Sequence, residues 1–310
     1  MARRRRKTRP LLRWTLTIAG AAAVFAAGLW LASGAGGRLR AARPDLPADR
    51  AARAPRTPDV AKPGRYAAAK PTDLAPVASP TPAPTPGRSA LVFDDLGRDV
   101  GQIDRLAALG VPLTYSVLPY ERWSREVAIE LEHRGAEVLC HLPMEAEGEE
   151  DPGPGALLEG MSRRRLAAAV ERALDQVPGA VGVNNHMGSK LTADREAMRE
   201  VLPLLGERGL FFLDSRTSSE SVGYEVALEL GVPTARRDVF LDAVDEDDAI
   251  RGEVRRWLEL AGTRGAAIAI AHPRKRTLAI LGEELPSVVE AGYEFVPLSY
   301  LLERGETLPE

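Results

Sequence analysis

Apolar, strand-like runs alternate with amphipathic, helix-like stretches from about Arg88 to the end of the chain. This alternation is typical of a parallel sheet whose strands are linked by helices. The runs are apolar almost throughout, which indicates strands buried on both faces. We predict strands at residues 90–95, 112–119, 137–142, 181–186, 210–215, 234–242, 266–272 and 293–298, and helices that include residues 124–134, 164–176, 195–207 and 248–261.

Seven or eight such units within residues 88–310 fit a closed or nearly closed (β/α) barrel better than a Rossmann sheet. The turn after the first strand reads Phe93-Asp94-Asp95-Leu96-Gly97. A dinucleotide-binding fold carries Gly-x-Gly-x-x-Gly at this turn, so a dinucleotide site is disfavoured. The predicted fold class is therefore α/β, a distorted (β/α)7-8 barrel.

The N-terminal region has the pattern of a membrane anchor. Residues 1–13 form a basic head with seven Lys and Arg and no acid, and an apolar run follows at residues 14–32. Nineteen helical residues span about 28 Å, close to the hydrocarbon thickness of a bilayer. The positive-inside rule predicts a single-pass protein of a bacterial inner membrane, with a periplasmic or extracytoplasmic domain. A cleaved signal peptide is the alternative, since small residues follow Leu31.

Residues 33–87 are rich in Ala, Pro and Arg without a sustained apolar period, and they predict a disordered linker. The basic head adjoins a segment of membrane length, so a nucleic-acid-binding tail is disfavoured. Cys140 is the only cysteine, which excludes an intrachain disulfide and a cysteine-rich metal motif.

Polar side chains stand at the C-terminal ends of six predicted strands, whose interiors are almost wholly apolar. The strands of a parallel barrel all open at one face, so these side chains should converge there. Asp and Asn at strand ends also form turns and caps, which is the alternative for Asp214 and Asp242. Histidine has no special capping role. The strand-end residues are Asp94, Asp95, His141, Asn184, Asn185, His186, Asp214, Asp242 and His272.

This set of residues predicts a metal site with acid and base groups beside it. Two imidazoles and one carboxylate, with positions left for water, suit Zn²⁺ or another divalent transition metal. In the pair Asp94 and Asp95, one carboxylate can bind the metal while the other takes a proton from water. A metal lowers the pKa of its water and polarises an acyl oxygen. His272, arriving from the opposite side, could protonate a leaving amine.

Five motifs follow one another along residues 88–310: Leu91-Val-Phe-Asp-Asp-Leu-Gly97, His141-Leu-Pro-Met-Glu145, Gly182-Val-Asn-Asn-His-Met-Gly-Ser189, Phe212-Leu-Asp-Ser-Arg-Thr217 and Ala271-His-Pro273. In this order they resemble the divergent polysaccharide deacetylase family, a branch of the NodB-like superfamily of carbohydrate esterases. The resemblance implies a distorted (β/α) barrel that removes acetyl groups from N-acetylated sugars with a divalent metal, usually zinc.

The resemblance also implies roles for single residues. By position, Asp94 resembles the catalytic base, Asp95 the metal-binding carboxylate and His272 the general acid.

One motif departs from the superfamily. Ordinary members carry two metal-binding histidines four residues apart, whereas here Glu145 stands four residues after His141. Either His186 or Glu145 would then replace the missing ligand.

Further candidates concern the substrate. Arg216, beside Asp214, could bind a substrate anion or form a structural ion pair. Tyr120, after the second strand, could stack on a sugar ring. The basic run Arg274, Lys275 and Arg276 is solvated or attracts an anionic glycan. The possible substrate-binding or alternative ligand residues are Glu145, Asn185, Asp214, Arg216 and Asp242.

The sequence thus predicts a metal-dependent hydrolase that removes acyl (acetyl) groups from a cell-envelope polysaccharide, with Asp95, His141 and His186 holding the metal. The main alternative is a catalytically weak or inactive barrel that binds glycan and regulates. The missing second histidine favours this alternative, whereas the presence of both Asp94 and His272 opposes it. Glycoside hydrolysis by paired carboxylates is a third hypothesis, which leaves the three histidines unexplained.

Overall fold

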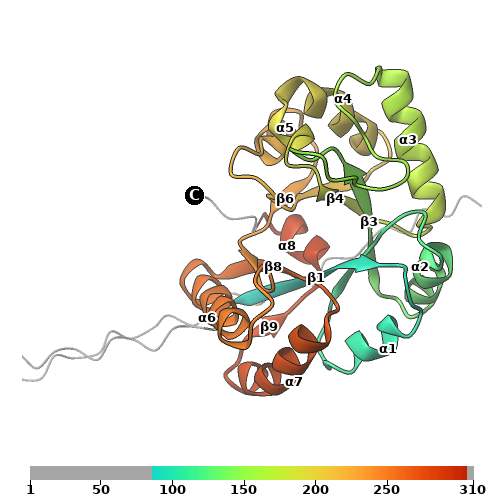
Figure 1. Cartoon of the computed structure of the whole chain (residues 1–310). Helices are drawn as coiled ribbons and strands as arrows, with labels where there is room; N and C mark the ends of the chain where they lie inside the picture. Colours follow the sequence, from blue (N-terminus) through green and yellow to red (C-terminus); the bar gives the residue numbers. More distant parts are fainter. Residues whose placement is uncertain (1–85, 306–310) are drawn as a thin grey trace, which may run out of the picture. The chain divides into compact units, whose positions relative to one another are not determined.

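A computed structural model describes residues 86–305, in which helices surround one nine-stranded parallel sheet (Figure 1). The predicted basic head, membrane anchor and nearly all of the predicted linker lie outside the described residues. Within residues 86–305, no helix is both long and apolar enough to span a bilayer. The strands are β1 (Arg88–Leu96), β2 (Thr114–Val117), β3 (Glu137–Met144), β4 (Gly182–Met187), β5 (Phe211–Asp214), β6 (Thr234–Arg236), β7 (Val239–Phe240), β8 (Ala266–Ala271) and β9 (Glu294–Phe295).

The helices confirm the sequence prediction closely. Asp194 begins α4 (Arg195–Gly206) as a cap, since its carboxylate accepts the backbone N–H groups of Glu196 and Ala197. Gly265, in the left-handed conformation with φ +86°, ends α6 (Asp247–Arg264). The other helices are α1 (Gln102–Ala107), α2 (Ser124–His133), α3 (Arg163–Gln176), α5 (Gly223–Glu229), α7 (Lys275–Glu290) and α8 (Leu298–Glu303), and a short 3₁₀ turn covers Leu191–Ala193.

The sheet is curled but open. Its strand order is β6-β5-β4-β3-β2-β1-β8-β7, and β9 pairs with the start of β1. All pairs are parallel, as predicted for strands linked by helices. A closed barrel would need its two edge strands to pair, and β6 and β7 do not pair within the described part of the chain.

The prediction of a single strand at residues 234–242 is wrong. The segment divides into β6 and β7, which lie at opposite ends of the strand order. The N–H of Arg237 donates to the carbonyl of Asp214 on β5, and the next N–H, of Asp238, donates to the carbonyl of Ile268 on β8. Two consecutive amides therefore bond to β5 and β8, the strands next to the two edges of the sheet, and we call this junction the seam.

The predicted strand at residues 293–298 is also shorter than expected. Only β9 is extended, and Pro297 then begins α8. Proline suits the start of a helix because it has no N–H to leave unpaired.

Side chains of the strands alternate between two faces, as the pleat requires. Leu91 and Phe93 face outward toward the helices, and they belong to the larger apolar cluster. Ala90 and Val92 face inward and pack with Leu301 of α8. The N–H of Ser299, at the start of α8, donates to the carboxylate of Glu137, the first residue of β3. Helix α8 therefore fills the inner face at the N-terminal ends of the strands, which leaves their C-terminal ends open.

Asp238 stabilises the seam. Its buried carboxylate accepts the N–H of Ile268 at 2.8 Å, so Asp238→Ala leaves that donor without its acceptor. We expect the free energy of unfolding to fall by about 1–3 kcal/mol, measured by urea unfolding. Arg264→Gln removes only the ion pair to Asp238 at 3.3 Å, and this control should change the same quantity by less than about 1 kcal/mol. Equal losses in the two variants would contradict this role.

The same carboxyl group predicts a pH dependence. Burial raises the pKa of Asp238 above its ordinary 3.8, although the Ile268 N–H and nearby arginines oppose the shift. A raised folded-state pKa means that this group stabilises the fold most below its unfolded pKa, and that the contribution is lost as the pH rises through the folded pKa. Asp238→Asn cannot ionise, so it should gain stability relative to wild type as the pH rises from below 3.8 through the raised folded-state pKa of Asp238. Parallel urea titrations measure the difference, and a constant difference would refute the expectation.

Candidate active site

Polar side chains occupy the inner face where the strands end. Along β1, Asp94 follows the inward-facing Val92 by two residues, and His141 follows Leu139 in the same way on β3. The inward-facing side chains are therefore apolar along the strands and become polar at the open, C-terminal end of the sheet. We call these inward-facing polar side chains the polar row. The other members of this polar row are Ser116, Asn184, His186, Ser215 and His272.

Asp95 reaches the same face through a β-bulge. Simple alternation would turn it outward with Phe93, but the pairing of β1 with β2 changes register between Phe93 and Leu96. Asp95 also has φ +62°, a left-handed conformation that is strained for any residue with a side chain. Its Oδ1 lies 3.4 Å from Nε2 of His141, and Oδ2 of Asp94 lies 3.6 Å from the same nitrogen. Both adjacent carboxylates thus meet one imidazole.

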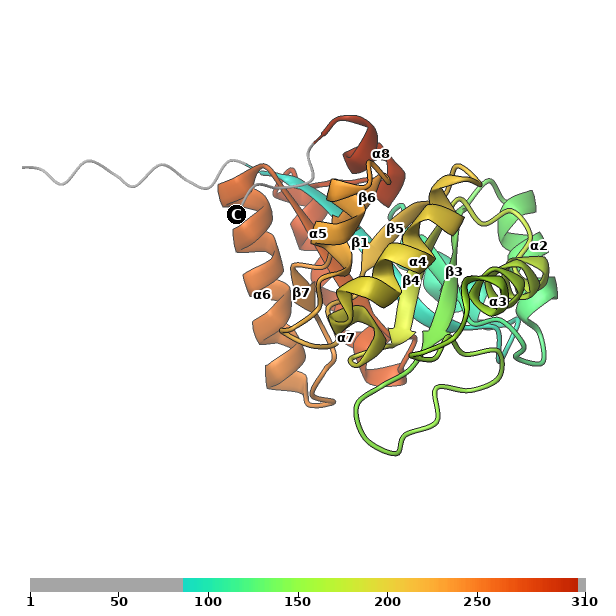
Figure 2. The same cartoon turned by 90° about the horizontal axis from the view of Figure 1, so that it is seen from above.

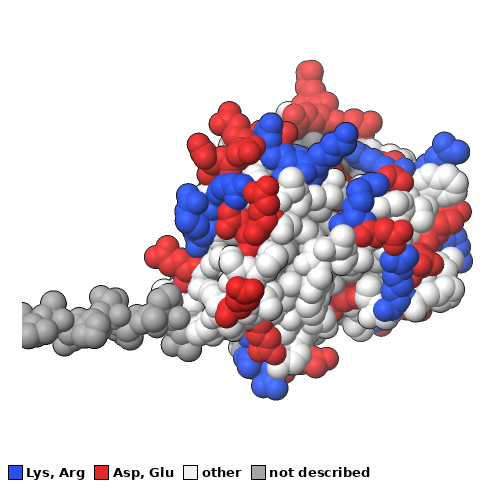
Figure 3. Space-filling view, turned by 90° about the horizontal axis from the view of Figure 1, so that it is seen from below, with Lys and Arg blue, Asp and Glu red and all other residues white. Residues whose placement is uncertain are grey.

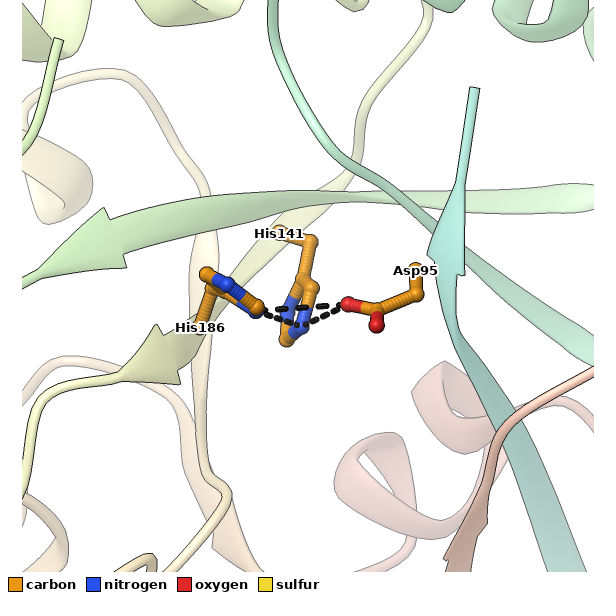
Figure 4. A group of neighbouring side chains, drawn as sticks. All are labelled: Asp95, His141 and His186. Atoms are coloured by element: carbon orange, nitrogen blue, oxygen red, sulfur yellow. Dashed lines mark hydrogen bonds and ion pairs between the residues drawn. The ribbon is translucent and has the colours of Figure 1, made fainter. Parts of the chain in front are cut away.

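Three side chains from three different strands point toward a common centre (Figure 4). Nδ1 of His186 lies 3.1 Å from Nε2 of His141 and 3.3 Å from Oδ1 of Asp95. With the 3.4 Å between Asp95 and His141, these atoms form a nearly equilateral triangle. A tetrahedral metal with bonds of about 2.0–2.1 Å places its ligand atoms about 3.3 Å apart. The triangle therefore suits one face of a tetrahedral zinc site.

The electrostatics of the triangle also suit a cation. Oδ1 of Asp95 is buried and has no hydrogen-bond partner among the described residues. Burial alone would raise the pKa of Asp95, but the neighbouring His141 and His186 outweigh it and hold that pKa well below its usual range. Burial lowers the pKa of His141, and the charges of Asp94 and Asp95 more than reverse this. The carboxylate is therefore ionised, as a metal ligand must be.

Asn184 orients His141. Its Oδ1 lies 3.0 Å from Nδ1 of His141, so this nitrogen carries the proton and Nε2 is left with a lone pair toward the centre. The same oxygen accepts the hydroxyl of Ser116, and the amide nitrogen donates to Asp94 at 2.9 Å and to Ser215 at 3.2 Å. Asn184 was among the predicted strand-end residues, without a role of its own, whereas Ser116 and Ser215 were not. Their period-two spacing with the inward-facing residues of their strands is the signal that could have found them.

His272 forms a separate pair with Asp242. Nδ1 of His272 lies 3.0 Å from Oδ1 of Asp242, and its Nε2 lies 3.9 Å from Oδ2 of Asp95. The hydroxyl of Thr277 and the backbone N–H of His272 donate to the other oxygen of Asp242. Burial opposes ionisation of Asp242, yet the hydrogen bond and charge of His272 lower its pKa. Asp242 therefore fixes the imidazole from behind, with Nε2 facing the triangle.

The structure does not bring the remaining predicted residues into the triangle. Glu145 instead binds Lys190 at 2.7 Å and accepts the N–H of Glu159, and the hydrogen bond from Lys190 lowers its pKa. Of the two alternatives for the missing ligand, the structure therefore places His186, and not Glu145, at the centre.

Asp214 and Asn185 each lie two residues after an outward-facing residue, Phe212 and Val183, so they fall on the outer face of the sheet. Both form hydrogen bonds with backbone groups. Asp214 accepts the N–H groups of Arg216 and Tyr224, as expected for a turn-forming residue. Asn185 accepts the N–H of Ser215 and donates to the carbonyl of Met187. The Arg216 side chain forms no ion pair with a carboxylate within residues 86–305. The alternation of strand faces explains why these residues do not join the triangle.

A cavity of about 230 Å³ opens beside His186. Tyr120, the sequence-based candidate for sugar stacking, lines this cavity together with His186. The polar residues around it are Arg98, Tyr120, Glu121, Asp151 and His186.

Comparison with known proteins identifies relatives. A protein of Haemophilus influenzae is 34% identical over 201 residues, which cover 65% of this chain and 72% of that protein. The Escherichia coli protein YibQ is 35% identical over 195 residues, and the match covers 63% of this chain and 61% of YibQ. The crystal structure of an Agrobacterium tumefaciens protein superposes with a TM-score of 0.64 at 25% identity, covering 71% of this chain and 91% of that chain.

Residues 91–302 match the family described as divergent polysaccharide deacetylase. The matched segment contains all five sequence motifs and all three corners of the triangle. It spans more than half of the chain, and the family is the one that the motifs resemble. The chain belongs to the divergent polysaccharide deacetylase family.

Proposed function

We propose that the domain is a metal-dependent hydrolase that removes acetyl or related acyl groups from a cell-envelope polysaccharide. The observation that carries the proposal is the triangle of Asp95, His141 and His186, with Asp94 and His272 beside it. A ligand set, a base and an acid around one centre are what hydrolysis of an amide or ester requires.

A divalent metal such as Zn²⁺, held by Asp95, His141 and His186, would supply a Lewis acid that activates water and polarises the acyl oxygen. Asp94 acts as the general base toward the attacking water. Its Oδ2 faces the centre, while its Oδ1 accepts the amide of Asn184 at 2.9 Å. That hydrogen bond fixes the direction of the free oxygen.

His272 acts as the general acid toward the leaving group. Asp242 holds the Nδ1 proton, so Nε2 is the atom that gives and regains a proton at the substrate. The carboxylate behind it stabilises the protonated ring. His272 directly follows β8, and Asp94 lies on the neighbouring strand β1, so acid and base are two separate side chains that can act on different atoms of the scissile bond.

The alternative, a barrel that binds glycan without turnover, drew support from the missing second histidine. His186 brings a second imidazole next to His141 and Asp95, which favours the hypothesis of an active enzyme. Glycoside hydrolysis needs a free pair of carboxylates. Asp214 and Asp242 are both fixed by protein hydrogen bonds, which disfavours that hypothesis.

The proposed place of action is the outer side of a bacterial inner membrane. Its support is the basic head at residues 1–13 and the apolar run at residues 14–32.

Elemental analysis of the purified protein tests the ligand set. We expect a stoichiometric divalent metal in the wild type and its loss in His141→Ala and in His186→Ala, because each removes one corner of the triangle. Glu145→Gln is the matched control, since Glu145 binds Lys190 and Glu159 instead, and it should keep the metal. A metal-free wild type would overturn the mechanism.

Acetate release from N-acetylated glycan fragments then separates enzyme from binder. Asp94→Asn should keep its metal but release acetate about 10²–10⁴-fold more slowly, the usual effect of losing a general base. A wild type that holds metal and binds glycan, yet releases no acetate, would support the binding alternative.

Asp242→Asn tests the positioning of His272. The variant keeps the shape of the side chain but removes the charge that stabilises the protonated imidazole. We expect acetate release to fall at least about tenfold, and its pH profile to shift, with metal content unchanged. Arg276→Gln, which alters only contacts to Asp245 and Asp247, is the control. An unchanged pH profile in Asp242→Asn would refute the positioning role.

A further inference from the structure

A second, larger cavity adjoins the one beside His186. It measures about 550 Å³ and is lined by residues of α3 and of the long loop that connects β3 to α3. Figure 2 shows the course of this loop beside the sheet. The floor of the cavity includes Ala168 and Ala169, and its walls carry Arg164, Arg165 and Arg172. Arg165, Ala168 and Arg172 follow one another at helical spacings of three and four, so they line one stripe of α3.

The three arginines have no acidic partner. Within residues 86–305, none of them forms an ion pair, although Arg163 in the same helical turn binds Glu200 and Glu207. Most basic side chains on the face drawn in Figure 3 have acidic neighbours. The one acid of the cavity wall, Asp151, accepts the N–H of Gly153 in its own loop. The cavity therefore combines three uncompensated positive charges with an apolar floor.

The basic run after His272 behaves differently. Arg274 donates to the carbonyl of Asp242, and Arg276 pairs with Asp247 at 3.0 Å. These guanidinium groups are already engaged, so the arginines of α3 are the better anion ligands.

The two cavities share part of their walls. Asp151, Pro152 and Gly153 line both of them, so the larger cavity continues from the cavity beside His186. Tyr120 stands at this junction: its ring packs so closely on Gly155 that a Cβ there would come within 2.3 Å. The hydroxyl of Tyr120 is buried without a hydrogen-bond partner, close enough to Arg172 for that charge to affect it. Burial raises the pKa of Tyr120, so the hydroxyl keeps its proton and can donate it to an anion.

We infer that this second cavity binds an anionic group, a carboxylate or a phosphate, carried by the same glycan strand whose acyl group reaches the triangle. The inference rests on the proposed function for the identity of the polymer. Guanidinium groups bind carboxylate and phosphate through paired hydrogen bonds, whereas a neutral sugar offers nothing to offset three positive charges. The substrate is accordingly an acidic polysaccharide that lies across both cavities.

Binding measurements on the full-length protein test the inference. The probes are a hexuronic acid hexasaccharide, a phosphorylated hexasaccharide and a neutral N-acetylglucosamine hexasaccharide. We expect at least one anionic probe to bind more tightly than the neutral one, and added salt to reduce the difference. Arg165→Gln with Arg172→Gln should weaken the anionic probe about tenfold or more and the neutral probe less than about twofold.

The matched control is Arg255→Gln with Arg256→Gln on α6, at the other side of the domain from α3 (Figure 1). It removes the same charge and should leave all three affinities within about twofold. Equal weakening by the two double variants, or no preference for either anionic probe, would overturn the inference. His141→Ala separates it from the proposed function: this variant should lose metal and acetate release but keep the anion affinity.

Discussion

In a parallel strand only every second side chain faces inward, and the rest of the site follows from this constraint. The inward row is apolar where α8 packs and polar where the strands end, so one alternation serves both the core and the chemistry. It delivers Asp94, His141 and His186 from three strands without a long loop between them. Rigid strands hold side chains more precisely than loops do, which suits the metal-dependent centre proposed above.

The same alternation leaves a buried polar group, Asn184, that has to be satisfied. All of its hydrogen-bonding capacity is directed at the site: the amide donates to Asp94 and Ser215, and the oxygen faces His141 and Ser116. A buried network of this kind is rigid when complete and costly when one member is lost. Asn184 thereby links the proposed base to one proposed metal ligand, so the two cannot move independently.

Much of this could be predicted from the sequence, for physical reasons. Hydrophobic periodicity and caps located the main helices, because these are local properties of the chain. Converging strand ends indicated the polar cluster before any geometry was known. The division of residues 234–242 into β6 and β7 left no local trace, since it depends on which distant strands are nearby. Asp214 and Asn185 are polar residues at strand ends, like the residues of the site, but they fall on the outer face of the sheet. The bulge that turns Asp95 inward is likewise a product of strand pairing.

Asp95 is one of four non-glycine residues that have a left-handed backbone conformation within residues 86–305. Within residues 86–305 the other non-glycine residues with positive φ are Tyr120, Met187 and Arg216, and each stands at or just beyond the C-terminal end of a strand. Such conformations cost of order 1–3 kcal/mol apiece, and glycine would relieve them. Stability of the fold would therefore favour glycine at the C-terminal edge of the sheet, whereas the site needs side chains there. Glycine would remove the Asp95 side chain from the triangle and the Tyr120 side chain from the wall of the neighbouring cavity, so a relative that keeps both side chains keeps the strain together with the site.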